Sequence, residues 1–149
     1  MGLPNVIALL VLTHAAHAYD LTKTLDSVSW AETRGVLLVG DNGRSLSHYQ
    51  IYDSTWEHIN QIRKDSGLPQ LPHSSALQEG VARQMASTYL VWLAGKYESL
   101  TRRRPTPEIL YLMYTMGFSG AKRIGFRISS APSVKRKGVS RFVTHYYGK

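Results

Sequence analysis

Apolar residues recur at steps of three and four residues in several segments of this chain, and this periodicity constrains its fold more than any other feature. In the first such segment Leu21, Leu25 and Val28 form one apolar face. Asp20 stands just before them and is a favourable N-terminal cap, so we predict a helix over residues 21–32. Because the other segments repeat this pattern, the chain is expected to be mainly α.

Three later segments carry recognisable helix starts. Ser-Thr-Trp-Glu at 54–57 and Ser-Ala-Leu-Gln at 75–78 have the pattern of capping boxes, and Thr106 precedes a proline at the first helical position. Glycine residues mark the expected helix ends. The predicted helices span 54–66, 75–95 and 106–116.

The predicted long helix over 75–95 carries a face of large apolar residues. This face comprises Leu77, Val81, Met85, Tyr89 and Trp92. Aromatic residues at helical spacing are more often part of a core than platforms for sugar rings. We expect core packing here, with sugar stacking as the alternative.

A short β region is expected between the first two helices. Val36 to Val39 is an apolar run rich in β-branched residues, and Asp-Asn-Gly at 41–43 is a turn signal. We predict a small hairpin whose return strand runs over 48–52.

One carboxylate stands where the first helix should be apolar. Glu32 follows Val28 by four residues and so falls on the same face. Loss of water disfavours the charged form of a carboxylate, so burial would raise its pKa toward the range of a general acid. The alternative is that Glu32, in the last turn before Gly35, points to solvent.

Residues 1–18 have the features of a secretory signal peptide. They contain no charged side chain, an apolar run over 6–12, and Ala-His-Ala at 16–18 that fits a cleavage site before Tyr19. The run is shorter than a membrane-spanning helix of about 20 residues. We expect an exported protein with one domain over 19–149; a buried first helix or a membrane tether is the alternative.

The net charge and the absence of cysteine limit the class of partner and the kinds of catalytic or metal site that the chain can have. The net charge is +8, which favours a polyanionic partner. The basic runs 102–104 and 135–137 either attract such a substrate or are solvated loops. There is no cysteine, so stability rests on packing, and cysteine nucleophiles and thiolate metal sites are excluded.

The region from Glu32 to Trp56 resembles the lysozyme superfamily. The resemblance is carried by Glu32, by the Gly-Asp-Asn-Gly-Arg-Ser-Leu-Ser run at 40–47, by Tyr-Gln-Ile at 49–51 and by Trp56. Soluble lytic transglycosylases have a similar Glu-Ser, Gln-Ile and Trp pattern. Invertebrate-type lysozymes have a similar Asp-x-Gly-Ser-Leu-Ser run followed by Tyr-Gln-Ile. The resemblance implies a mainly α, α+β lysozyme-like domain with a small β-hairpin flanking the cleft.

The resemblance also implies a set of site residues. Glu32 would be the catalytic acid, and Asp41 the second carboxylate of the invertebrate type. The motif and the later helices supply further residues of the sugar cleft. These substrate-binding candidates are Ser45, Ser47, Tyr49, Gln50, Tyr114, Thr115 and Tyr147, with Thr144 as a marginal one.

The activity implied is cleavage of the β-1,4 bond between N-acetylmuramic acid and N-acetylglucosamine in peptidoglycan. Two second steps of the reaction are possible. A lytic transglycosylase would need Glu32 alone, and we prefer this reaction. A hydrolytic muramidase, such as a phage lysis enzyme, would also use Asp41. The implied location is periplasmic or extracellular, in the service of a secretion, pilus or virion assembly, with no membrane span once the signal is removed.

Two noncatalytic alternatives remain. A peptidoglycan-binding scaffold of the same fold is favoured by His48 and Thr115, which stand where the families have Gly and Asn, and disfavoured by the intact Glu32 and Gln50. A nucleic-acid binder is suggested by charge alone, and the expected export argues against it.

Other chemistries lack their motifs. The histidines do not have the four-residue helical pairing of zinc proteases. Gly-Arg-Ser-Leu-Ser at 43–47 lacks the last glycine of a serine-hydrolase elbow. No glycine-rich loop precedes a helix that starts with Lys-Ser or Lys-Thr. We therefore expect no metal and no cofactor.

Overall fold

The structure, a computed structural model, describes residues 19–36, 39–40 and 45–148. This part of the chain is mainly helical, which confirms the expected class. The predicted signal peptide, residues 1–18, lies outside the described residues. The helices are α2 (Leu21–Thr33), α3 (Asp53–Asp65), α4 (Glu79–Thr101), α5 (Pro107–Arg123) and α6 (Ser133–Tyr147), with short 3₁₀ turns η2 (His73–Ser75) and η3 (Ile128–Ser130).

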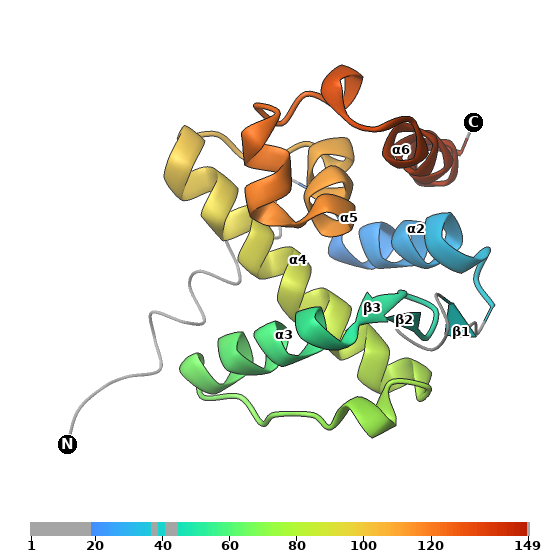
Figure 1. The fold of residues 1–149 in the computed structure, drawn as a ribbon, viewed down its shortest axis with the longest axis vertical. Helices are drawn as coiled ribbons and strands as arrows, with labels where there is room; N and C mark the ends of the chain where they lie inside the picture. Colours follow the sequence, from blue (N-terminus) through green and yellow to red (C-terminus); the bar gives the residue numbers. More distant parts are fainter. Residues whose placement is uncertain (1–18, 37–38, 41–44, 149) are drawn as a thin grey trace.

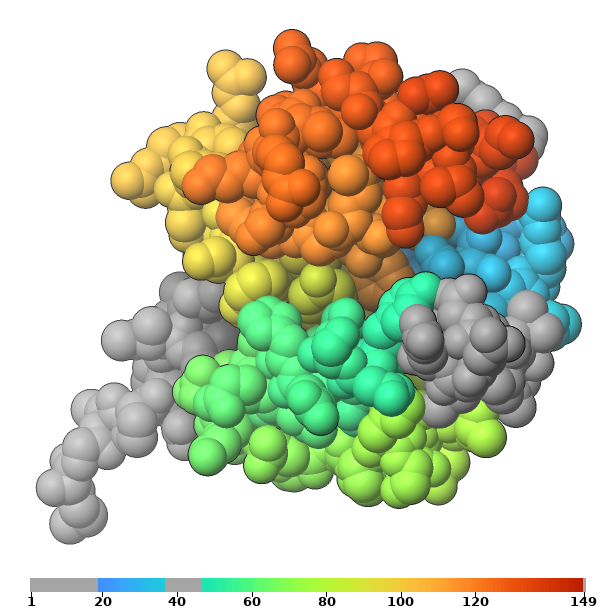
Figure 2. All heavy atoms as spheres, in the orientation of Figure 1, coloured from blue at the N-terminus to red at the C-terminus, as the bar shows by residue number. Residues whose placement is uncertain are grey.

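The long helix α4 crosses the molecule diagonally, with α3 on one side of it and α5 on the other (Figure 1). α6 packs on both α2 and α5. The described part therefore has two halves, α5 with α6 and α3 with the small sheet, which α2 and α4 join. In the space-filling view the surface is hollowed where the two halves meet (Figure 2).

The first helix follows its sequence signals closely. The Oδ1 atom of Asp20 accepts the backbone N–H of Lys23 at 2.9 Å. At the other end Arg34 and Gly35 have φ values of 59° and 77°, a left-handed turn that ends α2. Leu25 and Val28 are buried on the predicted face.

The β region differs from the predicted hairpin. It is a three-stranded antiparallel sheet in the order β1 (Val39–Gly40), β2 (Ser45–Leu46), β3 (Ile51–Tyr52). The prediction of a single return strand over 48–52 is wrong, because residues 47–50 form a turn between β2 and β3. The Ser47 carbonyl accepts the Gln50 side-chain Nε2 at 2.8 Å, and Ser47 Oγ accepts the Tyr49 backbone N–H at 3.1 Å.

The two predicted capping boxes are wrong. α3 begins at Asp53 and α4 at Glu79, and neither N-cap residue makes a side-chain hydrogen bond to its helix. Residues 73–75 form η2 instead, and Leu77, expected in the core, is 46% exposed. In both helices an acidic residue opens the first turn, where the helix dipole favours negative charge.

α4 also continues past its predicted end at Gly95. Leu93, Ala94 and Tyr97 extend its buried face on both sides of this glycine, so packing outweighs the low helix propensity of glycine. Arg102, with φ of 60°, ends the helix.

α5 begins as predicted, with the Thr106 hydroxyl accepting the N–H of Ile109 at 3.4 Å. The predicted break occurs at Gly117, whose φ of 73° and ψ of 157° are not helical. The chain then resumes a helical path to Arg123, because Ala121 is buried and Phe118 packs near Phe126.

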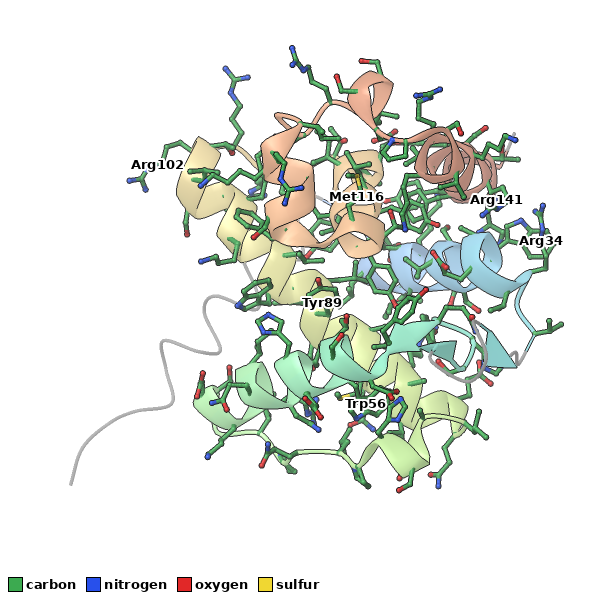
Figure 3. The ribbon with its side chains drawn as sticks, in the orientation of Figure 1. Arg34, Trp56, Tyr89, Arg102, Met116 and Arg141 are labelled. Atoms are coloured by element: carbon green, nitrogen blue, oxygen red, sulfur yellow. The ribbon has the colours of Figure 1, made fainter. Side chains whose placement is uncertain are left out.

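The core lies along α4 and between the helices that surround it. Trp56, labelled in Figure 3, fills the α3 side, and its indole N–H donates to the Leu71 carbonyl at 2.8 Å. Other large side chains that are fully buried are Tyr49, Ile59, Met85, Leu90, Leu93, Leu110, Tyr111 and Phe142.

Candidate active site

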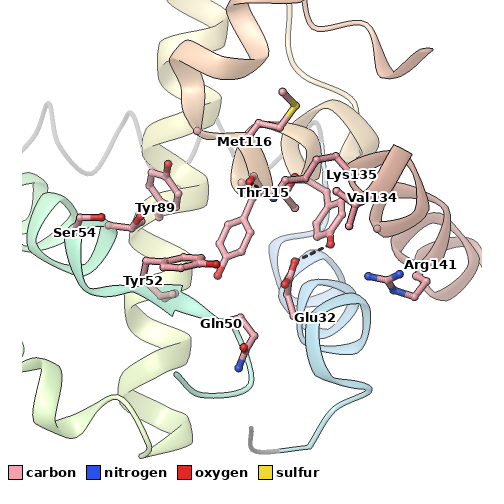
Figure 4. A pocket seen from close by; sticks show the side chains of 16 residues that line it. Glu32, Gln50, Tyr52, Ser54, Tyr89, Thr115, Met116, Val134, Lys135 and Arg141 are labelled. Carbon is pink, nitrogen blue, oxygen red and sulfur yellow. Dashed lines mark hydrogen bonds between the residues drawn. The ribbon is translucent and has the colours of Figure 1, made fainter. Parts of the chain in front are cut away.

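A pocket of about 420 Å³ lies where α2, β3, α3, α4, α5 and α6 approach one another. This volume is within the usual range for small-molecule sites. The pocket is drawn in Figure 4. Its lining residues are Glu32, Gln50, Ile51, Tyr52, Ser54, Thr55, Tyr89, Tyr111, Tyr114, Thr115, Met116, Gly117, Val134, Lys135, Gly138 and Arg141.

Glu32 comes from the last turn of α2 and is partly buried in this pocket (Figure 4). Its Oε1 atom accepts the hydroxyl of Tyr111 at 2.7 Å. The buried face of α2 carries Glu32 to this position, four residues after Val28. The alternative prediction, that Glu32 points to bulk solvent, is therefore wrong.

The pKa of Glu32 is raised above its ordinary value. Burial, which removes water from the carboxylate, is the dominant cause, and it outweighs the Tyr111 hydrogen bond and the positive charges of Lys135 and Arg141, which act to lower the pKa. A carboxylic acid of raised pKa with one oxygen held in place has the properties of a general acid.

Tyr111 is held by its own surroundings. It is 1% exposed, and its ring stacks on Phe142 with a centroid distance of 4.7 Å. Burial and the charge of Glu32 raise the pKa of Tyr111, so its hydroxyl remains a protonated donor to the carboxyl group. Tyr111 therefore acts as a positioning residue for Glu32.

The α5 side of the pocket depends on the break at Gly117. Thr115, Met116 and Gly117 all line the pocket, and the φ of 73° at Gly117 turns the chain there at little cost only for glycine. The Tyr114 hydroxyl donates to the Tyr49 carbonyl at 2.8 Å, which ties α5 to the turn before β3.

The structure brings together four of the residues predicted from the sequence. Glu32, Gln50, Tyr114 and Thr115 all line the pocket. Asp41 lies outside the described residues, as does the side chain of Ser45, whose backbone belongs to β2.

Three other predicted binding residues do not line the pocket. Ser47 is fully buried and closes its own turn, and Tyr49 is 1% exposed with its hydroxyl accepting from Arg83 at 2.9 Å. Tyr147 lies at the end of α6, where its hydroxyl bonds to Glu108. The marginal candidate Thr144 is likewise absent from the lining.

Several pocket residues were not predicted. Tyr111 lies three residues before Tyr114, a helical step that could have suggested it. Lys135, Gly138 and Arg141 also follow three-residue steps, and they share the α6 face that borders the pocket. Tyr89 was expected in the core; it is buried and also lines the pocket.

Within the described residues no group of three or more His, Asp or Glu is placed to hold a metal ion. In the same part of the chain we find no helix with the length and apolarity to cross a membrane. Comparison of the chain with protein-family models, curated proteins and solved structures gives no match.

Replacing Glu32 by Gln should make the protein more stable at neutral pH. Since the folded state raises the Glu32 pKa, ionisation of Glu32 opposes folding once the pH exceeds the ordinary carboxyl range. At lower pH the group is protonated in both states and the penalty vanishes. Urea unfolding at a series of pH values should show the advantage of Glu32→Gln growing as the pH rises from the ordinary carboxyl pKa to the raised pKa of Glu32, and constant above it. A stability difference that does not change with pH would contradict the raised pKa.

Replacing Tyr111 by Phe should raise the pKa of Glu32 further. A hydrogen bond to the charged form of a carboxyl group lowers its pKa. The Tyr111 hydroxyl stabilises the Glu32 carboxylate, and its removal raises that pKa further, while Phe keeps the stack on Phe142. NMR titration of the Glu32 carboxyl group measures this shift, and a shift of the pKa to a lower value would refute the assigned role.

Replacing Gly138 by Ala should disturb the same hydrogen bond from the α6 side. A Cβ at Gly138 would lie 3.1 Å from the Tyr111 hydroxyl oxygen, so that oxygen must move. We expect the pKa of Glu32 to rise, because a displaced Tyr111 hydroxyl stabilises the carboxylate less. Gly95→Ala is the matched control, since its Cβ would meet no atom within 4 Å. Equal Glu32 pKa values in the two variants, measured by NMR titration, would count against this contact.

Proposed function

We propose that this chain is a lysozyme-like glycosidase that cleaves the β-1,4 bond between N-acetylmuramic acid and N-acetylglucosamine in peptidoglycan. One observation carries the proposal: Glu32, with a raised pKa and a hydrogen bond from Tyr111, lines a pocket of about 420 Å³. Polar and aromatic side chains from five other elements surround it, which suits a sugar ring with many hydroxyl groups.

The arrangement of elements supports the lysozyme-like assignment. The acid stands at the end of the first described helix, and a small antiparallel sheet contributes Ile51 and Tyr52 to one side of the pocket. Gln50, the central residue of the Tyr-Gln-Ile motif, lines the same side. These are the features that the sequence resemblance implies for the superfamily.

In the proposed reaction Glu32 donates its proton to the glycosidic oxygen as the bond to the anomeric carbon breaks. The leaving N-acetylglucosamine becomes neutral, and the muramyl ring develops oxocarbenium character. Glu32 is then a carboxylate and can accept a proton in the second half of the reaction. Tyr111 supplies a hydrogen bond that strengthens as this negative charge forms.

For the second half of the reaction we favour intramolecular transglycosylation. The muramyl 6-hydroxyl attacks the anomeric carbon and gives its proton back to Glu32, which produces a 1,6-anhydro ring and uses one carboxylate. Glu32 is the one carboxylate among the described residues that line the pocket. A hydrolytic ending would use Asp41, which lies outside the described residues.

The proposal places the protein at the bacterial wall, in the periplasm or outside the cell, with peptidoglycan as its partner. A secretion, pilus or virion assembly that must open the wall locally would be its setting. The net charge of +8 suits a wall that carries carboxylates and phosphates.

The test is release of soluble material from dye-labelled, purified peptidoglycan by the full chain. We expect time-dependent release by the wild type and none by Glu32→Gln. Tight binding without release by both proteins would instead establish a noncatalytic scaffold.

A further inference from the structure

Two cations from α6 border the pocket next to Glu32. Lys135 and Arg141 lie on one face of the helix, on either side of Gly138, and both line the cavity (Figure 4). Both side chains are partly buried. They are therefore part of the pocket wall and not of the outer basic surface.

Neither cation is neutralised by an ion pair within the described structure. Lys135 donates from Nζ to the Thr115 carbonyl at 2.8 Å, and Arg141 donates from Nε to the Ala31 carbonyl at 3.0 Å. The salt bridges found among the described residues join other groups, Arg83 to Asp26 and His73 to Asp53. The single charge of Glu32, on which both cations act, can balance only one of them, so a bound anion would balance the other.

The net charge of the pocket lining also favours a bound anion. Among its lining residues Glu32 faces these two cations, so the lining is positive even with Glu32 ionised and more so when it is protonated. The C-terminal third of the chain, which includes α5 and α6, strengthens the positive potential of the pocket. Residues 96–149 contain twelve Lys or Arg and two Asp or Glu, whereas residues 1–95 contain six and eight.

We propose that Lys135 and Arg141 form a carboxylate-binding subsite beside Glu32, which makes the pocket selective for an acidic sugar over a neutral one. The inference rests on the proposed function and specifies the substrate class of the same site. Each cation has further N–H groups beyond the one that holds it to a carbonyl, so each can donate a charge-assisted hydrogen bond to a ligand. The carboxylate would be the lactyl group of muramic acid or an acid group of an attached peptide stem.

The test compares the binding of small saccharides to the full chain in a Glu32→Gln background, so that no glycan is cleaved. The probes are N-acetylglucosaminyl-N-acetylmuramic acid, the same disaccharide with its lactyl group joined to L-alanyl-D-isoglutamine, and neutral chitobiose. Calorimetry should show at least one acidic probe binding about tenfold more tightly than chitobiose, as expected for charge-assisted hydrogen bonds. Preference for the first probe alone assigns the lactyl carboxylate, and preference for the second assigns the stem.

Variants then assign the selectivity to the two cations. Lys135→Met and Arg141→Met should each reduce the preference several-fold, through a larger loss of affinity for the acidic probes than for chitobiose. Lys137→Met is the matched control, since Lys137 is exposed on the same helix and does not line the pocket. Arg141→Lys, which keeps the charge, should retain most of the preference and guards against a folding defect in Arg141→Met.

The outcomes separate this inference from the proposed function. Equal affinity for acidic and neutral saccharides, or a preference that both methionine variants retain, would overturn the carboxylate subsite while leaving the glycosidase proposal in place. Binding of none of the three saccharides by the folded protein would overturn both.

Discussion

If the proposed function holds, replacing Glu32 by Gln is expected to lower the rate of peptidoglycan cleavage by a factor of roughly a hundred to ten thousand, because the Gln amide has no acidic proton to transfer to the leaving oxygen. The substitution keeps the size of the side chain and an oxygen that can accept the Tyr111 hydroxyl. The fold should therefore be retained. The rate of soluble product release, measured beside the far-UV circular dichroism spectrum, checks both parts of this expectation.

Glu57→Gln is the matched control for that measurement. Glu57 is exposed on α3 and does not line the pocket, so its substitution should leave the rate unchanged. A Glu32→Gln variant that keeps more than a tenth of the wild-type rate would remove Glu32 from the mechanism. An equal loss in Glu57→Gln would show that the effect is not specific to the pocket.

Replacing Trp56 by Ala should produce the largest loss of stability among the substitutions considered. Trp56 is 1% exposed, its ring meets His73 edge-on at 5.2 Å, and its indole N–H donates to the Leu71 carbonyl. Removing a buried Trp leaves a cavity, which costs about 3–5 kcal/mol. The Leu71 carbonyl keeps its second donor, the Asn60 Nδ2 atom at 2.8 Å, so the loss comes from packing. The total free energy of unfolding of a folded domain is only about 5–15 kcal/mol. Urea unfolding at neutral pH should show this loss.

Trp30 provides the comparison for the same residue type at the surface. It is 37% exposed and stacks on His145, so Trp30→Ala should cost less than about 1 kcal/mol. Similar losses at the two positions would mean that the α3 side of the core is not packed as described. Because Ser54 and Thr55 line the pocket from α3, Trp56→Ala should also weaken saccharide binding.

Helix starts were predictable where a side chain makes the capping bond itself. Asp20 and Thr106 both do so, and both predicted starts hold. The two capping boxes failed because α3 and α4 begin elsewhere, without a side-chain cap. We attribute the positions at which α3 and α4 begin to packing on neighbouring elements. A local sequence motif contains no information on that packing.

Helix ends could not be predicted from glycine residues alone. Gly95 and Gly117 both interrupt apolar helical sequence, yet Gly95 is helical and Gly117 is not. The difference depends on whether the buried face continues past the glycine in three dimensions. The sequence alone contains no signal that separates the two cases.

The candidate site was predictable on the α2 side and not on the α6 side. Periodicity placed Glu32 on the buried face, and the resemblance pointed to Gln50 and Tyr114. Lys135 appeared in the sequence only as part of a basic run, and Arg141 lies more than a hundred residues from Glu32. Their approach to Glu32 depends on the packing of α6 against α2, which no local pattern encodes.

The most direct test of the central claim, that Glu32 drives cleavage of the muramyl glycosidic bond, is mass spectrometry of the soluble products that the full chain releases from purified peptidoglycan. We predict fragments that end in 1,6-anhydromuramic acid, released by the wild type and absent with Glu32→Gln. Reducing muramyl ends would retain the glycosidase assignment and replace the transglycosylase ending with hydrolysis. Products with intact glycan bonds, or no products while the protein remains folded, would contradict the claim.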